Sequence, residues 1–512
     1  MTPRLERALA QLPDLLLSHL QLTLLALFVA VLVSVPLGIV ATRKERLKQP
    51  MLTIAGIVQT IPALALLAVM VPALSSLGLP GIGFLPALLG LTLYCLLPIL
   101  WGTVTGLAEV DPAAVDAARG VGMTPMESLR LVELPLAMPV IVAGMRTATV
   151  WGVGMATLST PIGAPSLGQL IFSGLQTRNY TSVLVGCVAA ALLSQVLDRL
   201  VQALELGFSR RRPWLLRTAT AGLVGLAALA SGSAMMSTGV VGRAPVVIGG
   251  KAFTEQYVLT ALLADQVQKA GYEAEVTPSL GSSVVFDALR RGDIDLYVDY
   301  SGTIWAMVMK RNHIPDNRSA VLAQVRQYLW KHHRIEVVAA LGFENTYALA
   351  MREAVAAKLG IRTISDLARQ SSKLEIGGDF EFFERPEWRS LQDRYGLKFA
   401  QRRAMETALL YQAAEQNKVQ VVSAYSTDGR LNAFEMRVLE DDLGVIPPYD
   451  AMLLASGRLA EGHRMLLQRL SKLDGTISAA AMRRANDLVD LQKQSPEVAV
   501  NALRASPSKS GQ

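Results

Sequence analysis

The chain has 512 residues, of which 51% are hydrophobic and only 18% are charged. The apolar excess is concentrated before about residue 240, so the composition excludes a single soluble globule and favours two unlike domains. The formal net charge is +7, but the basic residues cluster beside apolar stretches, which is typical of membrane proteins rather than of nucleic-acid-binding proteins. The two cysteines, Cys95 and Cys187, lie in apolar runs and indicate neither a disulfide framework nor a cysteine metal site.

Six apolar stretches in the first half have roughly the 20-residue length that a bilayer requires of a helix. They lie near 16–41, 51–73, 85–108, 138–158, 181–204 and 218–239. Cytoplasmic loops are enriched in Lys and Arg, and basic clusters follow the first and the fifth stretches: Arg43, Lys44, Arg46 and Lys48, then Arg210, Arg211, Arg212 and Arg217. We therefore expect both of these loops and the loop of about 109–137 inside, and the N-terminus and everything after about residue 240 outside.

The sixth stretch follows an arginine cluster and ends in small residues, as the apolar core of a signal peptide does. Because it lies in mid-chain, we interpret it as an uncleaved anchor that exports the segment after it. Cleavage near 230–234 is the alternative. The predicted organisation is a membrane domain over 1–210, the anchor and a linker over 211–244, and an exported domain over 245–505.

The loop between the third and fourth stretches contains a spaced motif of small residues. It resembles the EAA loop of ABC importer permeases, E-A-A-x3-G-x9-I-x-L-P, with Asp for Glu and Val for Ile, through Asp116, Ala117, Ala118, Gly122, Val132, Leu134 and Pro135. The resemblance implies a short cytoplasmic helix that seats in a groove of an ATPase, with Gly122 allowing a turn and Pro135 favouring a break before the next helix.

A phosphate-binding G-x4-G-K-[ST] pattern is absent from the sequence, since Lys251 is followed by Ala252 and lacks the earlier glycine. We therefore expect no cofactor in this chain and ATP on a separate ABC ATPase subunit. The resemblance also implies two membrane halves, and hence a homodimer of this chain or its pairing with a related permease.

The segment after about residue 245 alternates short buried-strand patterns with helical ones. Val246 to Ile248 reads as a strand before a helix over Thr254 to Gln268, and similar pairs recur near 283–298 and 364–376. The predicted fold class is an all-α membrane permease domain of about six helices, followed by an α/β domain.

Six segments of this half, in order, look like the substrate-binding proteins of osmoprotectant ABC importers, which bind glycine betaine, carnitine, choline and related compounds. They surround Lys251, Asp295, Tyr300, Tyr347, Tyr425 and Tyr449. The family fold is the two-lobed type II periplasmic binding fold, with lobe 1 expected over about 245–350 and 446–505 and lobe 2 over about 351–445. The resemblance implies that the lobes close on the ligand around a hinge.

A quaternary ammonium group donates no hydrogen bond, so a protein holds it with ring faces, shape and distant negative charge. The resemblance makes four tyrosines the aromatic cage for such a group: Tyr300, Tyr347, Tyr425 and Tyr449. The ligand's carboxylate needs donors, and the matching segments offer Gln256, Ser283 and Asn345.

Two segments depart from the common family pattern. Ser282 and Ser283 stand where many relatives have a Gly-Gly-Thr stretch, and Phe380 stands where a histidine is frequent. Some relatives accept ergothioneine, a betaine with a thio-imidazole ring, so an ergothioneine importer of the same architecture is the alternative to an osmoprotectant importer.

Two other classes of protein, enzymes and receptors, fit the sequence less well. The five histidines, His19, His313, His332, His333 and His463, show no metal spacing, so neither a metal site nor an enzyme is indicated. A ligand-sensing receptor would need a pore motif or a cytoplasmic output domain, whereas this chain has the coupling loop. The expected location is the inner or plasma membrane, with the chain crossing the lipid bilayer several times and the binding domain on the outer side.

Overall fold

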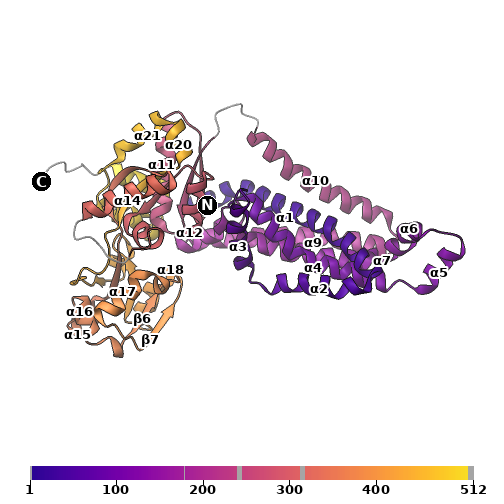
Figure 1. The fold of residues 1–512 in the computed structure, drawn as a ribbon, viewed down its shortest axis with the longest axis horizontal. Coiled ribbons are helices and arrows are strands. Elements are labelled where there is room, and N and C mark those ends of the chain that lie inside the picture. Colours follow the sequence, from indigo (N-terminus) through magenta and orange to yellow (C-terminus); the bar gives the residue numbers. More distant parts are fainter. Residues whose placement is uncertain (1–2, 178, 239–244, 312–317, 505–512) are drawn as a thin grey trace. The chain divides into compact units, whose positions relative to one another are not determined.

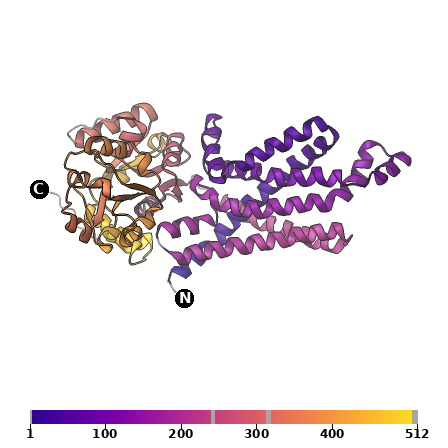
Figure 2. The same ribbon diagram turned by 90° about the horizontal axis from the view of Figure 1, so that it is seen from below.

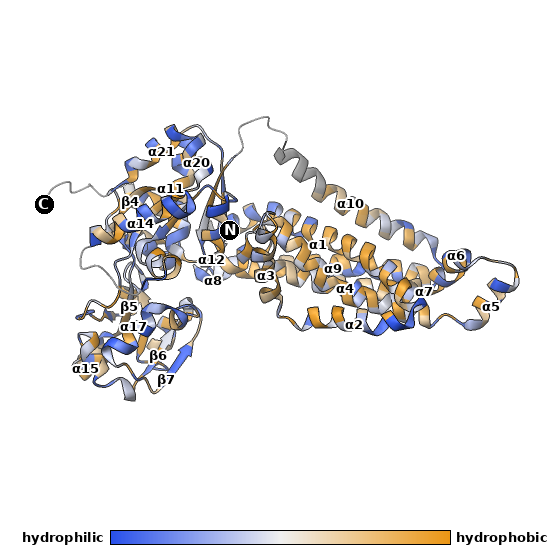
Figure 3. Cartoon of the chain, in the orientation of Figure 1, coloured by the Kyte–Doolittle hydropathy of each residue, from blue (hydrophilic) through white to orange (hydrophobic). Residues whose placement is uncertain are grey.

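The computed structural model describes residues 3–177, 179–238, 245–311 and 318–504. The chain divides into two compact units, one formed by residues 1–174 and 180–242 and the other by residues 175–179 and 243–512. Each unit is considered by itself. Apolar residues dominate the helices of the first unit, and polar residues are more frequent in the second (Figure 3).

The first unit is entirely helical, and its long helices run beside one another (Figure 2). Its elements are α1 (Pro3–Arg43), α2 (Glu45–Thr60), α3 (Ala63–Ser76), α4 (Phe84–Ala108), α5 (Pro112–Gly120), α6 (Pro125–Ser128), the π-helix η1 (Leu129–Glu133), α7 (Leu134–Ala156), η2 (Thr157–Ile162), α8 (Gly168–Gln176), α9 (Tyr180–Ser209) and α10 (Pro213–Thr238). Five described helices are long and apolar enough to cross a membrane, or up to six if the bent pair of α2 and α3 is one span. The prediction of an all-α membrane domain of about six helices is confirmed at this level.

The second predicted span is not a straight helix. Its two halves, α2 and α3, meet at an angle of 101°. Ile61 is extended and Pro62 stands immediately before α3. A proline disfavours helical geometry in the residue before it and supplies no backbone donor, so the helix ends at Thr60.

The second unit contains two five-stranded mixed sheets with helices packed on them (Figure 1). The first sheet has the order β2-β1-β3-β10-β4 and consists of β1 (Val246–Lys251), β2 (Ala274–Leu280), β3 (Leu296–Tyr300), β4 (Glu336–Glu344) and β10 (Asp450–Ala455). The second has the order β7-β6-β8-β5-β9 and consists of β5 (Tyr347–Arg352), β6 (Glu375–Gly378), β7 (Gln401–Ala404), β8 (Val421–Tyr425) and β9 (Met436–Val438).

The helical elements of this unit connect and cover the strands. They are α11 (Thr254–Lys269), α12 (Ser282–Arg291), α13 (Ser301–Thr303), η3 (Ile304–Val308), α14 (Arg318–His333), α15 (Glu353–Leu359), α16 (Ile364–Ala368), η4 (Ser371–Lys373), η5 (Phe382–Glu384), α17 (Pro386–Tyr395), α18 (Thr407–Glu415), α19 (Arg430–Ala433), α20 (Gly457–Gly462), α21 (Arg464–Leu470), η6 (Ser471–Leu473), α22 (Ala479–Asp490) and α23 (Pro496–Arg504). The helix predicted over Thr254 to Gln268 is α11, and it packs on the domain through an apolar face: Val258, Leu259, Leu262 and Leu263 are all at most 3% exposed.

The chain crosses between the two sheets twice. It leaves the first sheet between β4 and β5, and returns between β9 and β10. In both sheets three parallel strands are followed by one antiparallel strand, β10 or β5, and this strand also pairs antiparallel with the edge strand beyond it, so the two halves of the domain repeat one topology. The two crossings lie side by side, because the backbone N–H of Asn345 donates to the carbonyl of Tyr449 at 3.0 Å.

Candidate functional site

Backbone pairing places the four predicted tyrosines next to the crossings. Tyr347 opens β5 and lies directly opposite Tyr425, the last residue of the antiparallel strand β8. Tyr300 ends β3 and lies opposite Ala451, two residues after Tyr449. Residues distant in sequence therefore meet because the strands that carry them end at the same boundary between the sheets.

Three of the tyrosines form a compact group of rings, which we call the tyrosine cluster: Tyr347, Tyr425 and Tyr449. The ring centroids of Tyr347 and Tyr425 are 4.8 Å apart, and those of Tyr347 and Tyr449 are 6.0 Å apart in an edge-to-face arrangement. The Tyr425 hydroxyl donates to the Tyr347 hydroxyl at 2.9 Å. Rings at these separations touch one another, and the faces that they leave uncovered carry the negative electrostatic potential that attracts a cation.

Tyr300 joins this group through a residue that the sequence analysis did not select, Phe253. The Phe253 ring stacks on Tyr425 with a centroid separation of 6.0 Å and an interplanar angle of 3°, and it lies 6.4 Å from the Tyr300 ring. Phe253 immediately precedes α11, within the family-matching segment that contains Lys251. The sequence signal that could have identified Phe253 is its aromatic side chain within that family-matching segment.

A cation already lies on the tyrosine cluster. The guanidinium carbon of Arg385 is 4.9 Å from the centroid of the Tyr347 ring, and Arg385 is only 5% exposed. Its Nε and one terminal nitrogen each lie 3.3 Å from the Glu387 carboxylate, which accepts a hydrogen bond from the Tyr449 hydroxyl. The cluster therefore has the electrostatic character that cation binding requires.

Negative charge also stands behind Tyr425. The Tyr425 hydroxyl lies 3.4 Å from a carboxylate oxygen of Asp379, whose other oxygen accepts from the backbone N–H groups of Glu381 and Phe382. Burial raises the pKa of Asp379 above its ordinary value, and the two backbone donors oppose that rise.

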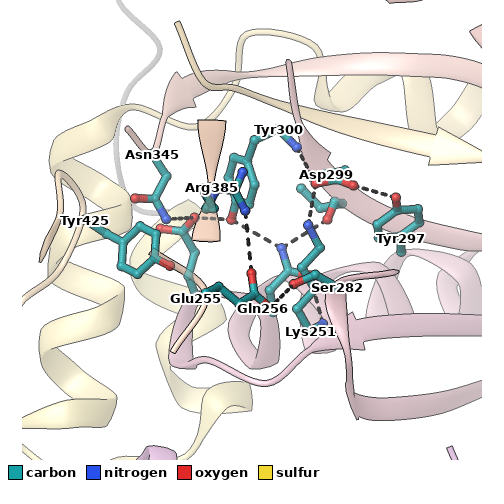
Figure 4. Close-up of polar contacts among 12 residues, drawn as sticks. Lys251, Glu255, Gln256, Ser282, Tyr297, Asp299, Tyr300, Asn345, Arg385 and Tyr425 are labelled. Carbon is teal, nitrogen blue, oxygen red and sulfur yellow. Dashed lines mark hydrogen bonds and ion pairs between the residues drawn. The ribbon is translucent and has the colours of Figure 1, made fainter. Parts of the chain in front are cut away.

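Glu255 in α11 is the centre of a second, fully buried network (Figure 4). It accepts hydrogen bonds from the hydroxyls of Tyr300 and Thr427, both at 2.5 Å, and from the side-chain amides of Asn345 at 3.0 Å and Asn486 at 3.2 Å. Burial raises the pKa of Glu255, and these four donors work against that rise. The network joins α11 and α22 to the end of β3, to the first crossing at Asn345 and to the segment that follows β8.

The three predicted carboxylate donors have different surroundings. Gln256 is fully buried and its amide nitrogen donates to the Val298 carbonyl and the Tyr300 hydroxyl, so it positions Tyr300. Asn345 donates to Glu255, while its buried amide oxygen has no hydrogen-bond partner among the described residues. Ser283 lies in α12, but its side chain is outside the described part of the structure.

Ser282 lies beside that position, and its hydroxyl donates to the Glu381 carboxylate at 2.8 Å. This bond joins the start of α12, next to the first sheet, to the loop that follows β6 in the second sheet. The two halves of the domain are therefore in direct polar contact at this point.

The predicted ATPase-coupling loop forms a short helix and a turn. Asp116, Ala117 and Ala118 lie in α5, with Ala118 buried and Asp116 exposed. Gly122 has a φ of +85°, a conformation that a side chain strains, so glycine is needed at this turn. Leu134 and Pro135 form the first turn of α7.

The prediction of a helix break at Pro135 is wrong. Residues 125–162 form one continuous helical segment. A π-helical turn, η1, immediately precedes α7, and the backbone N–H of Leu134 donates to the Leu129 carbonyl five residues earlier. Widening the helix in this way makes room for the proline ring and bypasses its missing donor.

An ion pair that the sequence analysis did not predict holds the same loop. One guanidinium nitrogen of Arg43, at the end of α1, lies 2.7 Å from both carboxylate oxygens of Glu133, and the Ser128 hydroxyl donates to that carboxylate at 3.1 Å. Glu133 is only 7% exposed. The ion pair ties the coupling loop to the first long helix.

Two family profiles match the chain. Residues 244–505 match the substrate-binding domain of the ABC-type glycine betaine transport system, and residues 34–210 match the inner-membrane component of binding-protein-dependent transport systems.

Individual relatives show the same two parts. The ergothioneine transport permease/ergothioneine binding protein EgtU of Helicobacter pylori (strain G27) is 32% identical over 484 residues, which is 92% of this chain and 86% of the relative. The choline transport system permease protein OpuBB of Bacillus subtilis (strain 168) is 42% identical over 187 residues, 36% of this chain and 83% of that protein. A glycine-betaine-binding protein of Pseudomonas aeruginosa is 34% identical over 271 residues, 50% of this chain and 86% of that protein.

The permease match and the long apolar helices make this a multi-pass membrane protein, and the relatives are transport permeases and binding proteins rather than enzymes. A permease of this kind works with a partner ATPase and a captured ligand. The chain belongs to the binding-protein-dependent ABC importers, as a permease fused to a substrate-binding domain of the glycine betaine transport type.

Proposed function

We propose that this chain drives the ATP-dependent uptake of a trimethylammonium zwitterion, a betaine-type solute, which it captures between the two halves of its binding domain. The observation that carries the proposal is the cation over Tyr347. A ring cluster that holds a buried guanidinium 4.9 Å from a ring centroid has the geometry and charge to hold an ammonium group.

The four tyrosines hold the ammonium group in this proposal, and Phe253 extends the aromatic wall. Asn345 lies at the crossing, and its amide nitrogen, which already donates one hydrogen bond to Glu255, carries a second hydrogen that it can offer to the ligand's carboxylate. Its amide oxygen has no partner among the described residues, but it is an acceptor and suits a ligand's donor instead. Gln256 acts indirectly, by holding Tyr300.

The remaining parts of the proposal concern the assembly. Two copies of this chain, or one copy and a related permease, form the pathway across the lipid bilayer. The binding domain lies on the outer side. The loop around Asp116 to Pro135 contacts a separate ATPase subunit, whose ATP hydrolysis drives the cycle.

Ergothioneine is the second candidate substrate. The observation in its favour is the Helicobacter pylori relative, which matches across 92% of this chain with the same fused arrangement. Glycine betaine, carnitine and ergothioneine share a trimethylammonium group and a carboxylate, so the tyrosine cluster alone does not distinguish among them.

The test is calorimetric titration of the full chain in lipid nanodiscs with glycine betaine, carnitine, choline, proline betaine and ergothioneine. Histidine betaine, which lacks the sulfur of ergothioneine, is the matched control for recognition of the thione. Binding at micromolar concentration or tighter by any trimethylammonium zwitterion supports the proposal. A chain that binds none of them, while remaining folded by circular dichroism, refutes it.

A further inference from the structure

The bend between α2 and α3 interrupts the backbone hydrogen bonding of the membrane unit. The first helix ends at Thr60, and Pro62, which has no N–H, stands before the second without a side-chain cap. Among the described residues, no group donates to the carbonyls of Thr60 and Ile61, and no group accepts from the N–H groups of residues 63–65. Both acceptors and donors of the backbone are therefore left without a protein partner at this bend.

The bend lies far from both ends of the neighbouring helix α4. The side-chain amide of Gln59, one residue before the end of α2, donates to the backbone carbonyl of Tyr94 in α4 at 3.1 Å. Tyr94 is ten residues after the start of α4 and 14 before its end, so it lies about 15 Å and 21 Å along the helix from these ends. A bilayer core is about 30 Å thick, so the bend lies at hydrocarbon depth.

Two side chains repair the backbone where α2 meets α4. Pro98 has no N–H to donate to the Tyr94 carbonyl four residues earlier, and the Gln59 amide takes its place. In return, the Tyr94 hydroxyl lies 3.4 Å from the Gln59 carbonyl, which has no helical donor because α2 ends at the next residue. The carbonyls of Thr60 and Ile61 and the first N–H groups of α3 receive no such repair.

The bend is also open to its surroundings. Thr60 and Pro62 are exposed in the single chain, and Leu64 is 47% exposed. Irregular backbone does not face lipid at this depth, and it occurs there only where protein buries it or where it lines a water-filled cavity. Water donates and accepts, so it satisfies the unpaired carbonyls and the unpaired N–H groups together, which apolar packing by a second membrane half does not.

We propose that the bend between α2 and α3 lines the water-filled path by which the solute crosses the membrane, and that the half-buried ring of Tyr94 meets the solute's ammonium group on that path. The inference rests on the proposed function for the identity of the solute, and it adds a site in the membrane unit to the one in the binding domain. A single ring suits a site of passage, because transport requires binding that is favourable enough for entry and weak enough for exit.

Thiol labelling of the full chain, assembled with its ATPase in nanodiscs, tests the path. The probe is Thr60→Cys on a Cys187→Ser background, in which the remaining Cys95 is buried. Leu192→Cys is the matched control, an apolar position near the middle of α9 that is 62% exposed. The reagent is a trimethylammonium methanethiosulfonate, which reacts with thiolates and so needs water at the cysteine. We expect Thr60→Cys to react at least about tenfold faster than the control, with ATP or without it.

Uptake into proteoliposomes tests the ring. Tyr94→Phe keeps the ring and Tyr94→Leu removes it, and the transported probes are radiolabelled glycine betaine and ergothioneine. We expect Tyr94→Leu to slow uptake by about threefold or more. Tyr94→Phe should transport as the wild type does, because the lost hydroxyl contact is long at 3.4 Å, and both variants should keep the wild-type affinity in calorimetric titration. Equal slowing by the two substitutions, or no slowing by Tyr94→Leu, overturns the role of the ring.

The outcomes separate this inference from the proposed function. If the wild type binds no trimethylammonium compound, the proposed function fails and the role of Tyr94 fails with it, whereas labelling at residue 60 still decides whether the bend lines a water-filled path. If the wild type binds and transports one of the probes but Thr60→Cys reacts no faster than Leu192→Cys in either state, only the inference is overturned.

Discussion

Gly302 lies against the ring of Tyr449, and a methyl group there would displace that ring. A Cβ atom at Gly302 would stand 2.6 Å from Cε2 and 2.7 Å from Cδ2 of Tyr449. Non-bonded carbon atoms settle at roughly 3.5–4.0 Å, so Gly302→Ala requires the ring to move by about 1 Å. Overpacking of this kind costs roughly 1–3 kcal/mol of unfolding free energy.

The same movement shifts the Tyr449 ring relative to the Tyr347 ring, and the two ring centroids are 6.0 Å apart in the wild type. A ligand that loses one cation–π contact loses about 0.5–2 kcal/mol, so the dissociation constant for a trimethylammonium ligand should rise by roughly 2- to 30-fold. The assay is calorimetric titration of the full chain, with the thermal unfolding midpoint measured in parallel.

Gly462→Ala is the matched control, because a Cβ atom at Gly462 meets no atom within 4 Å. It should change neither affinity nor midpoint. If Gly302→Ala binds as the wild type does, Tyr449 does not contribute to ligand binding in the way proposed. Loss of stability without loss of affinity would lead to the same conclusion.

Three further predictions concern other parts of the molecule. Tyr347→Ala should weaken binding of a trimethylammonium ligand by about tenfold or more in calorimetric titration. Tyr272→Ala is the control and should leave the affinity unchanged, because the Tyr272 ring packs on His463 at the amino end of β2. Equal effects of the two substitutions would contradict a role of the tyrosine cluster in binding. Glu133→Ala removes the contact between the coupling loop and Arg43. Substrate-stimulated ATP hydrolysis by the assembled transporter should then fall severalfold, while the substrate affinity stays the same. Unaltered stimulation would show that the ion pair plays no part in coupling. Burial raises the pKa of Asp490 from 3.8 to about 6. A carboxyl group with a raised pKa stabilises the fold at low pH, and this contribution is lost as the pH rises through the folded value. The stability of Asp490→Asn should therefore increase relative to that of the wild type between pH 4 and pH 7, and thermal midpoints that run parallel with pH for the two proteins would argue against the raised pKa.

Much of the fold could be predicted from local patterns. Apolar runs of membrane-spanning length mark most of the long helices, because lipid exposure and burial both demand apolar residues along the whole element. The start of α11 at Thr254 and of α16 at Ile364 agree with the structure, since helix periodicity is a property of neighbouring residues. The bend at Pro62 and the π turn before Pro135 were not predicted, because a proline permits several local solutions and packing selects one.

Some residues of the candidate site could be predicted from the sequence and others could not. Four tyrosines were selected from the sequence, and three of them form the ring cluster while Tyr300 joins through Phe253. Arg385 was not selected, because nothing in the residues around it distinguishes it from any surface arginine. Gln256 was selected as a ligand donor, but strand β3 brings Tyr300 and the Val298 carbonyl to its amide first.

The sequence by itself determined that a helical permease precedes an α/β binding domain, and it determined which tyrosines to examine, because composition, periodicity and motif spacing are written along the chain. Only the tertiary structure decided that Tyr347 faces Tyr425, that Glu255 gathers four donors, and that Arg385 lies on the ring cluster with Glu387 as its partner. Apart from the pair of Arg385 and Glu387, which are two residues apart, these contacts join residues on different strands and helices. Strand register and the two crossings between the sheets bring those residues together, and no short segment encodes either.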